Sequence, residues 1–190
     1  ARRSRSEERE EPDARLSVIR GAPSCRAGRT PFSFRRLLLM SLERRNQLIR
    51  ELCDLRGIGD ADRAIERGVI SIDDFDIAID FYEEDPAAIY VNFQFGIVSG
   101  GRTLRVFRLL LEANLSVYAQ DQAQLGVEAE TGGVILVVRG VLEANSDGQW
   151  LVEMIEHYVE HGRYWRENIL LSDDEMFRHL ADGNYLWIRA

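Results

Sequence analysis

The sequence predicts an α+β fold in which a twisted antiparallel sheet packs against three main helices, in the order α-βββ-α-ββ-α. Two kinds of pattern predict it. Short segments alternate apolar and polar residues, as strands with one buried face do, and three longer segments repeat apolar residues at helical spacing. The predicted strands come in groups with no helix between them, which does not match the βαβ order of a parallel sheet.

The first 39 residues are expected to lie outside this fold. They mix charges, contain scattered proline and glycine, and show no sustained period of 2 or 3.6. With ten Arg and five acidic residues, they carry a net charge of +5. We therefore predict a disordered, Arg-rich extension over residues 1–39. Two explanations stay open: Met40 is the natural start and the preceding residues are an upstream extension or a misassigned reading frame, or the basic tail is genuine.

The first helix is expected to begin directly after Met40 and to end at Gly57. Ser41 is a suitable N-cap, Glu43 lies in the first turn, and a glycine after the last turn is a common helix terminator. The apolar residues of this segment cluster on one side of the helix: Leu42, Leu48, Ile49, Leu52, Cys53 and Leu55. The polar stretch 60–68 that follows is compatible with a short helix.

Three strands are predicted next, over residues 69–72, 75–81 and 89–95. The second and third alternate strictly, with large apolar residues at the odd positions and mostly polar or small ones at the even positions. Acidic turns separate them. This pattern is typical of an antiparallel sheet with one buried face. Two further strands, over 125–129 and 134–138, flank a hairpin turn at 130–133.

A helix is predicted between the two groups of strands, over residues 102–115, and it has two apolar faces. Leu104, Phe107, Leu111 and Leu115 share one face, and Val106, Leu109 and Leu110 fall on roughly the opposite one. A helix at the surface of a small monomer needs one apolar face only. We therefore expect one face to lie on the sheet and the other to pack against a second copy of the protein.

The homodimer seam is assigned first to Val106, Leu109 and Leu110, with Leu104, Phe107 and Leu111 against the protein's own sheet. The reverse assignment is also open, because periodicity shows two stripes without saying which one points inward. A last helix is predicted over residues 147–170, followed by a C-terminal tail over residues 171–190. Its apolar stripe contains Trp150, Leu151, Met154, Ile155, Tyr158, Trp165 and Ile169.

Charge excludes several classes of partner. The chain has a net charge of −8, and residues 40–190 alone carry −13. Such a body is unsuited to nucleic acid or to an anionic membrane and favours a basic client. Cys25 and Cys53 form no CxxC pair, so a reducing cytoplasm is expected. The longest aliphatic run, residues 134–138, is too short to span a bilayer, and no signal-peptide pattern is visible.

No active site is predicted. His157 and His161 have the i, i+4 spacing of metal ligands, but Tyr158 stands where a zinc protease needs Glu, and the remaining histidine, His179, lies in the tail. The acidic turns match no EF-hand spacing. We therefore expect no metal, no cofactor and no enzymatic activity. An enzyme whose site is too diffuse to recognise in one sequence stays the alternative class, beside a binding module that uses its surplus apolar surface.

Three segments carry a family resemblance: "LLLEANL" at 109–115, "LGVEAETGGVILV" at 125–137 and "HYVEHGRYWRENIL" at 157–170. They resemble the Asn-containing helix end, the TG hairpin and the aromatic last helix of class I type III secretion chaperones of the Tir-chaperone (CesT-like) type. The resemblance runs from about residue 44 to 170. The basic extension, a longer connection at 60–67 and the C-terminal tail depart from the family pattern.

The resemblance implies a homodimeric, cytoplasmic bacterial chaperone without ATP or metal. Such a protein holds the N-terminal segment of a secreted effector extended and presents it to the secretion apparatus, whose ATPase is a further candidate partner. A client strand can add to a sheet edge in this way. The family's client contacts fall on the first helix and the adjoining sheet, which implies Leu48, Ile49, Leu52, Tyr90 and Asn92 here. The three aliphatic residues also fit a plain core. The alternative function is a related homodimeric sensory, regulatory or immunity-type protein.

Overall fold

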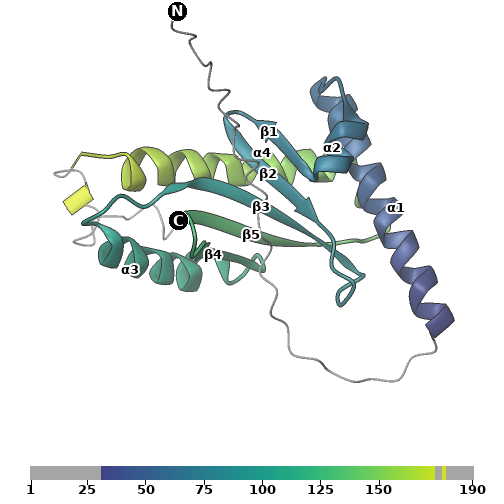
Figure 1. Ribbon diagram of the computed structural model, residues 1–190, viewed down its shortest axis with the longest axis horizontal. Coiled ribbons are helices and arrows are strands. Elements are labelled where there is room, and N and C mark those ends of the chain that lie inside the picture. Colours follow the sequence, from purple (N-terminus) through teal and green to yellow (C-terminus); the bar gives the residue numbers. More distant parts are fainter. Residues whose placement is uncertain (1–30, 174–176, 179–190) are drawn as a thin grey trace, which may run out of the picture.

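The computed structural model of the chain describes residues 31–173 and 177–178 and shows a five-stranded antiparallel sheet with helices packed around it (Figure 1). The strand order is β1-β2-β3-β5-β4. The predicted α+β class and order of elements are confirmed. The elements are α1 (Pro31–Arg56), α2 (Ala61–Arg67), β1 (Val69–Ile72), β2 (Phe75–Asp80), β3 (Ala88–Ile97), α3 (Thr103–Ala113), η1 (Asn114–Tyr118), β4 (Ala123–Val127), β5 (Gly133–Val141), α4 (Gly148–Trp165) and η2 (Arg166–Leu170).

Helix α1 begins earlier than the sequence analysis predicted. It runs from Pro31 through Met40 without a break, so the expected helix start at Ser41 is wrong. Ser41 lies inside the helix, where its hydroxyl donates a hydrogen bond of 2.8 Å to the carbonyl oxygen of Pro86. A proline is a favourable first residue of a helix, so Pro31 is a local signal for this start. The sequence analysis did not use it because the preceding residues have mixed charge and no helical period. Gly57 follows the helix with a φ of 67°, as its predicted role as terminator requires.

The turn between β1 and β2 is built from two aspartates. Asp73 and Asp74 have φ values of 50° and 64°, and a two-residue hairpin with positive φ at both positions has the twist that its strands need. At the opposite edge of the sheet, Gly132 adopts a φ of 71° in the predicted "ETGG" turn between β4 and β5. The predicted acidic turn after β1 and the predicted hairpin turn at 130–133 are therefore both present.

One face of the sheet forms the core together with α1 and α4. Alternate residues of β2, β3 and β5 point into it and are buried: Phe75, Ile77, Ile79, Ile89, Val91, Phe93, Phe95, Val134, Leu136 and Val138. Helix α4 lies behind the sheet in Figure 1. It packs closely there, because a Cβ built on Gly162 would come within 2.7 Å of the Phe75 ring and 2.9 Å of the Phe95 ring. The predicted apolar stripe of this helix is the one that faces the sheet.

Helices α3 and α4 each end in a π-helical turn, and α4 begins with a side-chain cap. The Asp147 side chain caps α4 by accepting a hydrogen bond of 2.9 Å from the backbone NH of Trp150. Helix α3 continues into the π-helical turn η1, and α4 continues into the π-helical turn η2. Together these segments cover the predicted helices 102–115 and 147–170, with α3 and η1 extending three residues further.

The described part of the C-terminal tail belongs to the core. Ser172 and Phe177 are buried, and the Phe177 ring lies under the guanidinium of Arg102, with 4.7 Å between the Arg102 Cζ and the ring centroid. The predicted domain boundary at residue 170 is therefore too early. Cys53, predicted to be a core residue, is buried as expected, and burial raises the pKa of its thiol.

Candidate functional site

Helix α3 presents an apolar stripe to solvent. Leu104 is 85% exposed, Leu111 70%, Leu115 82% and Phe107 38%. We call these four residues the α3 stripe. On the opposite side of the same helix Val106, Leu109 and Leu110 are buried in the protein's own core. The first assignment of the dimer seam to Val106, Leu109 and Leu110 is therefore wrong, and the reversed assignment, which includes Leu104 and Phe107, is the one that leaves apolar surface free.

Helix α1 does not expose the residues expected to contact a client. Leu48, Ile49 and Leu52 are completely buried between α1 and the rest of the core, so they are core residues and cannot touch a partner in this conformation. Among the side chains of α1 that the structure describes, the large apolar ones that are exposed are Leu39, Leu42 and Leu55. Tyr90 and Asn92, the other two predicted contacts, are half-buried and alternate with the buried residues of β3, so they lie on the sheet face opposite the core.

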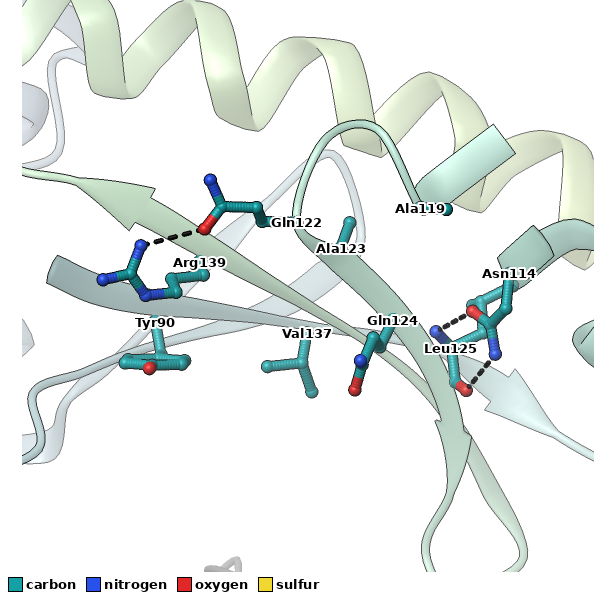
Figure 2. Close-up of a pocket in the computed structure, with 9 residues that line it drawn as sticks. All are labelled: Tyr90, Asn114, Ala119, Gln122, Ala123, Gln124, Leu125, Val137 and Arg139. Carbon is teal, nitrogen blue, oxygen red and sulfur yellow. Dashed lines mark hydrogen bonds between the residues drawn. The ribbon is translucent and has the colours of Figure 1, made fainter. Parts of the chain in front are cut away.

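This opposite face, which we call the open face of the sheet, carries the even-numbered residues of β3 and their neighbours. One row across the strands is formed by the register pairs Ala78–Asn92, Asn92–Val137 and Val137–Gln124. Figure 2 shows Tyr90, Val137 and Gln124 pointing to the same side of the sheet. Apolar Val137 thus lies between two amide side chains that can donate and accept hydrogen bonds, a combination suited to holding an extended peptide.

A charged network fixes one end of the open face. The Arg139 guanidinium donates two hydrogen bonds to the Asp85 carboxylate, of 2.5 and 2.9 Å, and a third of 2.9 Å to the Gln122 side chain. The Tyr90 hydroxyl donates to the same carboxylate at 2.8 Å. Hydrogen bonding to Arg139 lowers the pKa of Asp85, and burial raises the pKa of Tyr90. Asp85 and Arg139 therefore stay ionised at neutral pH, and their contacts with the neutral Tyr90 hydroxyl hold its ring edge-on to the ring of Tyr82.

A second carboxylate lies on the same face. Asp80 accepts a hydrogen bond of 2.7 Å from the Asn92 side chain, and burial raises the pKa of its carboxyl. Behind it, Arg45 of α1 reaches through to donate a hydrogen bond of 2.8 Å to the Ile79 carbonyl oxygen. Asn92 is therefore oriented by Asp80 and presents its amide in a defined direction.

The open face is hollowed beside β4. A cavity of about 740 Å³ is bordered by residues of β3, β4, β5 and η1, which Figure 2 labels: Tyr90, Asn114, Ala119, Gln122, Ala123, Gln124, Leu125, Val137 and Arg139. Two residues of the charged network, Tyr90 and Arg139, line one end. Its wall is thus a mixture of amides, small apolar side chains and one cation.

The chain matches the Tir chaperone protein (CesT) family over residues 47–166, well over half of its length. It belongs to that family. The resemblance of the three sequence motifs to type III secretion chaperones is thereby confirmed. The family is one of binding proteins and not of enzymes.

Other comparisons add little to this assignment. A chain of the crystal structure of the ExsC–ExsE complex is similar at 15% identity and a TM-score of 0.46, covering 55% of this chain and 77% of that one. None of the curated proteins matches closely enough to count as a relative.

None of the described helices of this CesT-family chain combines the length and the apolar character that crossing a membrane requires.

The Asn of the family motif "LLLEANL" has a structural role in this chaperone. The Asn114 amide donates a hydrogen bond of 3.0 Å to the Leu125 carbonyl oxygen and accepts one of 2.6 Å from the Leu125 NH (Figure 2). Because β4 is the last strand of the sheet, this side chain occupies the backbone groups that a neighbouring strand would use. The motif thus joins α3 to the sheet edge.

The His pair of α4 forms no metal site among the described residues. No group of three or more His, Cys, Asp or Glu side chains lies close enough there to hold a metal ion, and His179 lies outside the described residues. His161 Nδ1 lies 3.1 Å from the Tyr118 hydroxyl, with the His157 ring 4.6 Å away, centroid to centroid. Burial, and then the neighbouring His157, lower the pKa of His161. The pair therefore links α4 to η1.

The sequence analysis did not predict the ion pair between Asp85 and Arg139 or the structural role of Asn114. Asp85 and Arg139 are far apart in the chain, and nothing in either local pattern indicated that they meet. The motif residue Asn114 was noted for its family resemblance without a structural role. The signal that could have found Arg139 is its position: it is the one charged residue in the strand 133–141.

Proposed function

We propose that this CesT-family chaperone holds the N-terminal segment of a secreted effector in an extended form against the open face of its sheet. Family membership over residues 47–166 is the observation that carries the proposal. The face offers apolar contact at Val137, hydrogen-bonding amides at Asn92 and Gln124, and the cavity beside β4. An extended client needs these features, because its backbone groups must be paired while its apolar side chains leave water.

The same proposal includes the bacterial cytoplasm as the working compartment and the secretion apparatus, with its ATPase, as the destination of the loaded complex. The negative body of the protein favours clients with basic segments and keeps the complex dissolved.

Co-expression with effectors encoded nearby in the genome, followed by measurement of co-elution and affinity, tests the client surface. Val137→Glu should weaken binding about tenfold or more, because burying a valine is worth roughly 1.5 kcal/mol or more. Leu55→Glu, on the exposed side of α1, is the matched control and should bind normally. Loss of binding in the Leu55 variant alone would move the client surface to α1 and overturn the assignment to the sheet.

The proposal also includes a homodimer in which the α3 stripes of two copies pack against each other. Weighted by their exposed fractions, the eight side chains of the two copies would together contribute about 8–16 kcal/mol gross. The cost of association is about 4–15 kcal/mol, so the stripe is large enough to support a dimer without making it very tight. Sedimentation at micromolar concentration tests this, since Leu111→Glu should yield a folded monomer.

A further inference from the structure

The C-terminal region is anchored next to the start of the α3 stripe. Phe177 is only 3% exposed and packs against Arg102. Arg102 Nη1 in turn donates hydrogen bonds of 3.5 Å to the Ile169 carbonyl oxygen and the Ser172 hydroxyl. Because Arg102 directly precedes α3, the chain leaves its anchor at one end of that helix, two residues before Leu104.

The residues that follow this anchor contain an apolar run. Residues 179–190 read "HLADGNYLWIRA", in which Tyr185, Leu186, Trp187 and Ile188 are consecutive. From Arg178 to this run there are seven to ten residues, which reach about 23–33 Å when extended. The stripe is about 16 Å long from Leu104 to Leu115, at 1.5 Å per residue. The run can therefore reach every position of the stripe.

We propose that residues 185–188 cover the α3 stripe of their own chain and compete there with a second copy. The inference rests on the homodimer proposed above. Both surfaces are apolar, and the attachment through Phe177 raises the local concentration of the run to about the millimolar range. A second copy at micromolar concentration meets a stripe that is already occupied for part of the time. The tail, which departs from the family pattern, thus sets the concentration at which the chaperone dimerises.

The size of the effect follows from the tether. A run that binds the stripe with a Kd of about 0.5 mM occupies it for two thirds of the time at an effective concentration of about 1 mM. The run must leave the α3 stripe of both copies before they can pair, and each stripe is free for one third of the time. The apparent Kd of the dimer therefore rises about tenfold.

The first test follows Trp187 in the full chain labelled with 5-fluorotryptophan. Its fluorine resonance is the one that disappears in Trp187→Phe. We expect Trp187 to be shielded from solvent at low protein concentration, and to become exposed in Leu104→Asp/Leu111→Asp and when the dimer forms. The proposal is overturned if Trp187 is exposed in the unaltered chain, if it stays shielded when the stripe is charged, or if its shielding grows with concentration, which indicates exchange of tails between copies.

The second test measures dimerisation by sedimentation. Leu186→Ser/Trp187→Ser/Ile188→Ser should lower the dimer Kd about tenfold. The matched control, Asp182→Ser/Asn184→Ser/Arg189→Ser, changes as many tail residues outside the apolar run and should leave the Kd unchanged. An equal Kd in all three proteins overturns the competition while the homodimer stands. If no variant dimerises and Trp187 is still shielded by the stripe, the homodimer fails and the docked tail stands.

Discussion

Of two adjacent leucines of α3, one should lose much stability when replaced with alanine and the other almost none. Leu110 is 5% exposed and Leu111 is 70% exposed. Replacing a buried leucine with alanine costs about 2–5 kcal/mol, because the packing contacts are lost and a cavity is left. Each kcal/mol lowers the Tm of a domain of this size by about 2–4 °C, so Leu110→Ala should melt about 4–20 °C lower. Leu111→Ala should change the free energy of unfolding of the monomer by no more than about 0.5 kcal/mol.

Urea unfolding at several protein concentrations separates stability from dimerisation. The apparent stability of the unaltered chain should rise with concentration, because the dimer binds only folded chains. Leu111→Ala should weaken that dependence and leave the low-concentration limit unchanged, whereas Leu110→Ala should lower the limit itself. Equal losses for the two variants at the lowest concentration would refute the assignment of the buried and exposed faces of α3.

Three further substitutions test other parts of the fold. Because burial and His157 lower the pKa of His161, the folded protein binds a proton at this residue less readily than the unfolded chain does. The free energy of unfolding should therefore fall as the pH drops through about 6.5, the ordinary pKa of histidine. In urea melts at a series of pH values, His161→Gln should make that fall smaller. Gly162→Ala should lower the free energy of unfolding by about 1–3 kcal/mol, since its Cβ meets two phenylalanine rings, and an unchanged calorimetric melt would contradict the close packing. Asn114→Ala removes both hydrogen bonds to Leu125 and should cost about 1–3 kcal/mol, with hydrogen exchange of the Leu125 amide as the specific readout; continued protection of that amide would show that the Asn114 hydrogen bonds are not needed to hold β4.

The elements of the fold could be predicted from the sequence because each has a local signature. Alternation identified β2 and β3, and helical periodicity identified α3 and α4, since one side of each element is apolar and the other is not. Helix α1 begins at Pro31, ten residues before the predicted start at Ser41. A capping serine at position 41 is a good local signal, but it was overridden by a helix that continues through it.

The candidate site was harder to predict because it depends on which elements meet. Periodicity gave α3 two apolar stripes of similar character, and only its packing on the sheet decides that Leu109 is buried and Leu104 exposed. For α1, the family resemblance suggested client contacts at Leu48 and its neighbours, whereas the core of this chain uses them completely. The ion pair between Asp85 and Arg139 joins residues 54 positions apart, beyond the reach of any local pattern.

The two hydrogen bonds between Asn114 and Leu125 also affect how readily the sheet could promote aggregation, a risk for any protein that binds unfolded polypeptides. A sheet edge with unpaired NH and carbonyl groups is a template on which other strands can grow into ordered aggregates. In this fold one edge strand, β4, has its middle residue already occupied by an amide, and the opposite edge strand, β1, is only four residues long. An extended client of the kind proposed above would thus meet edge strands with few unpaired backbone groups. The asparagine of the family motif thus also removes backbone groups of β4 on which another strand could add and start an aggregate.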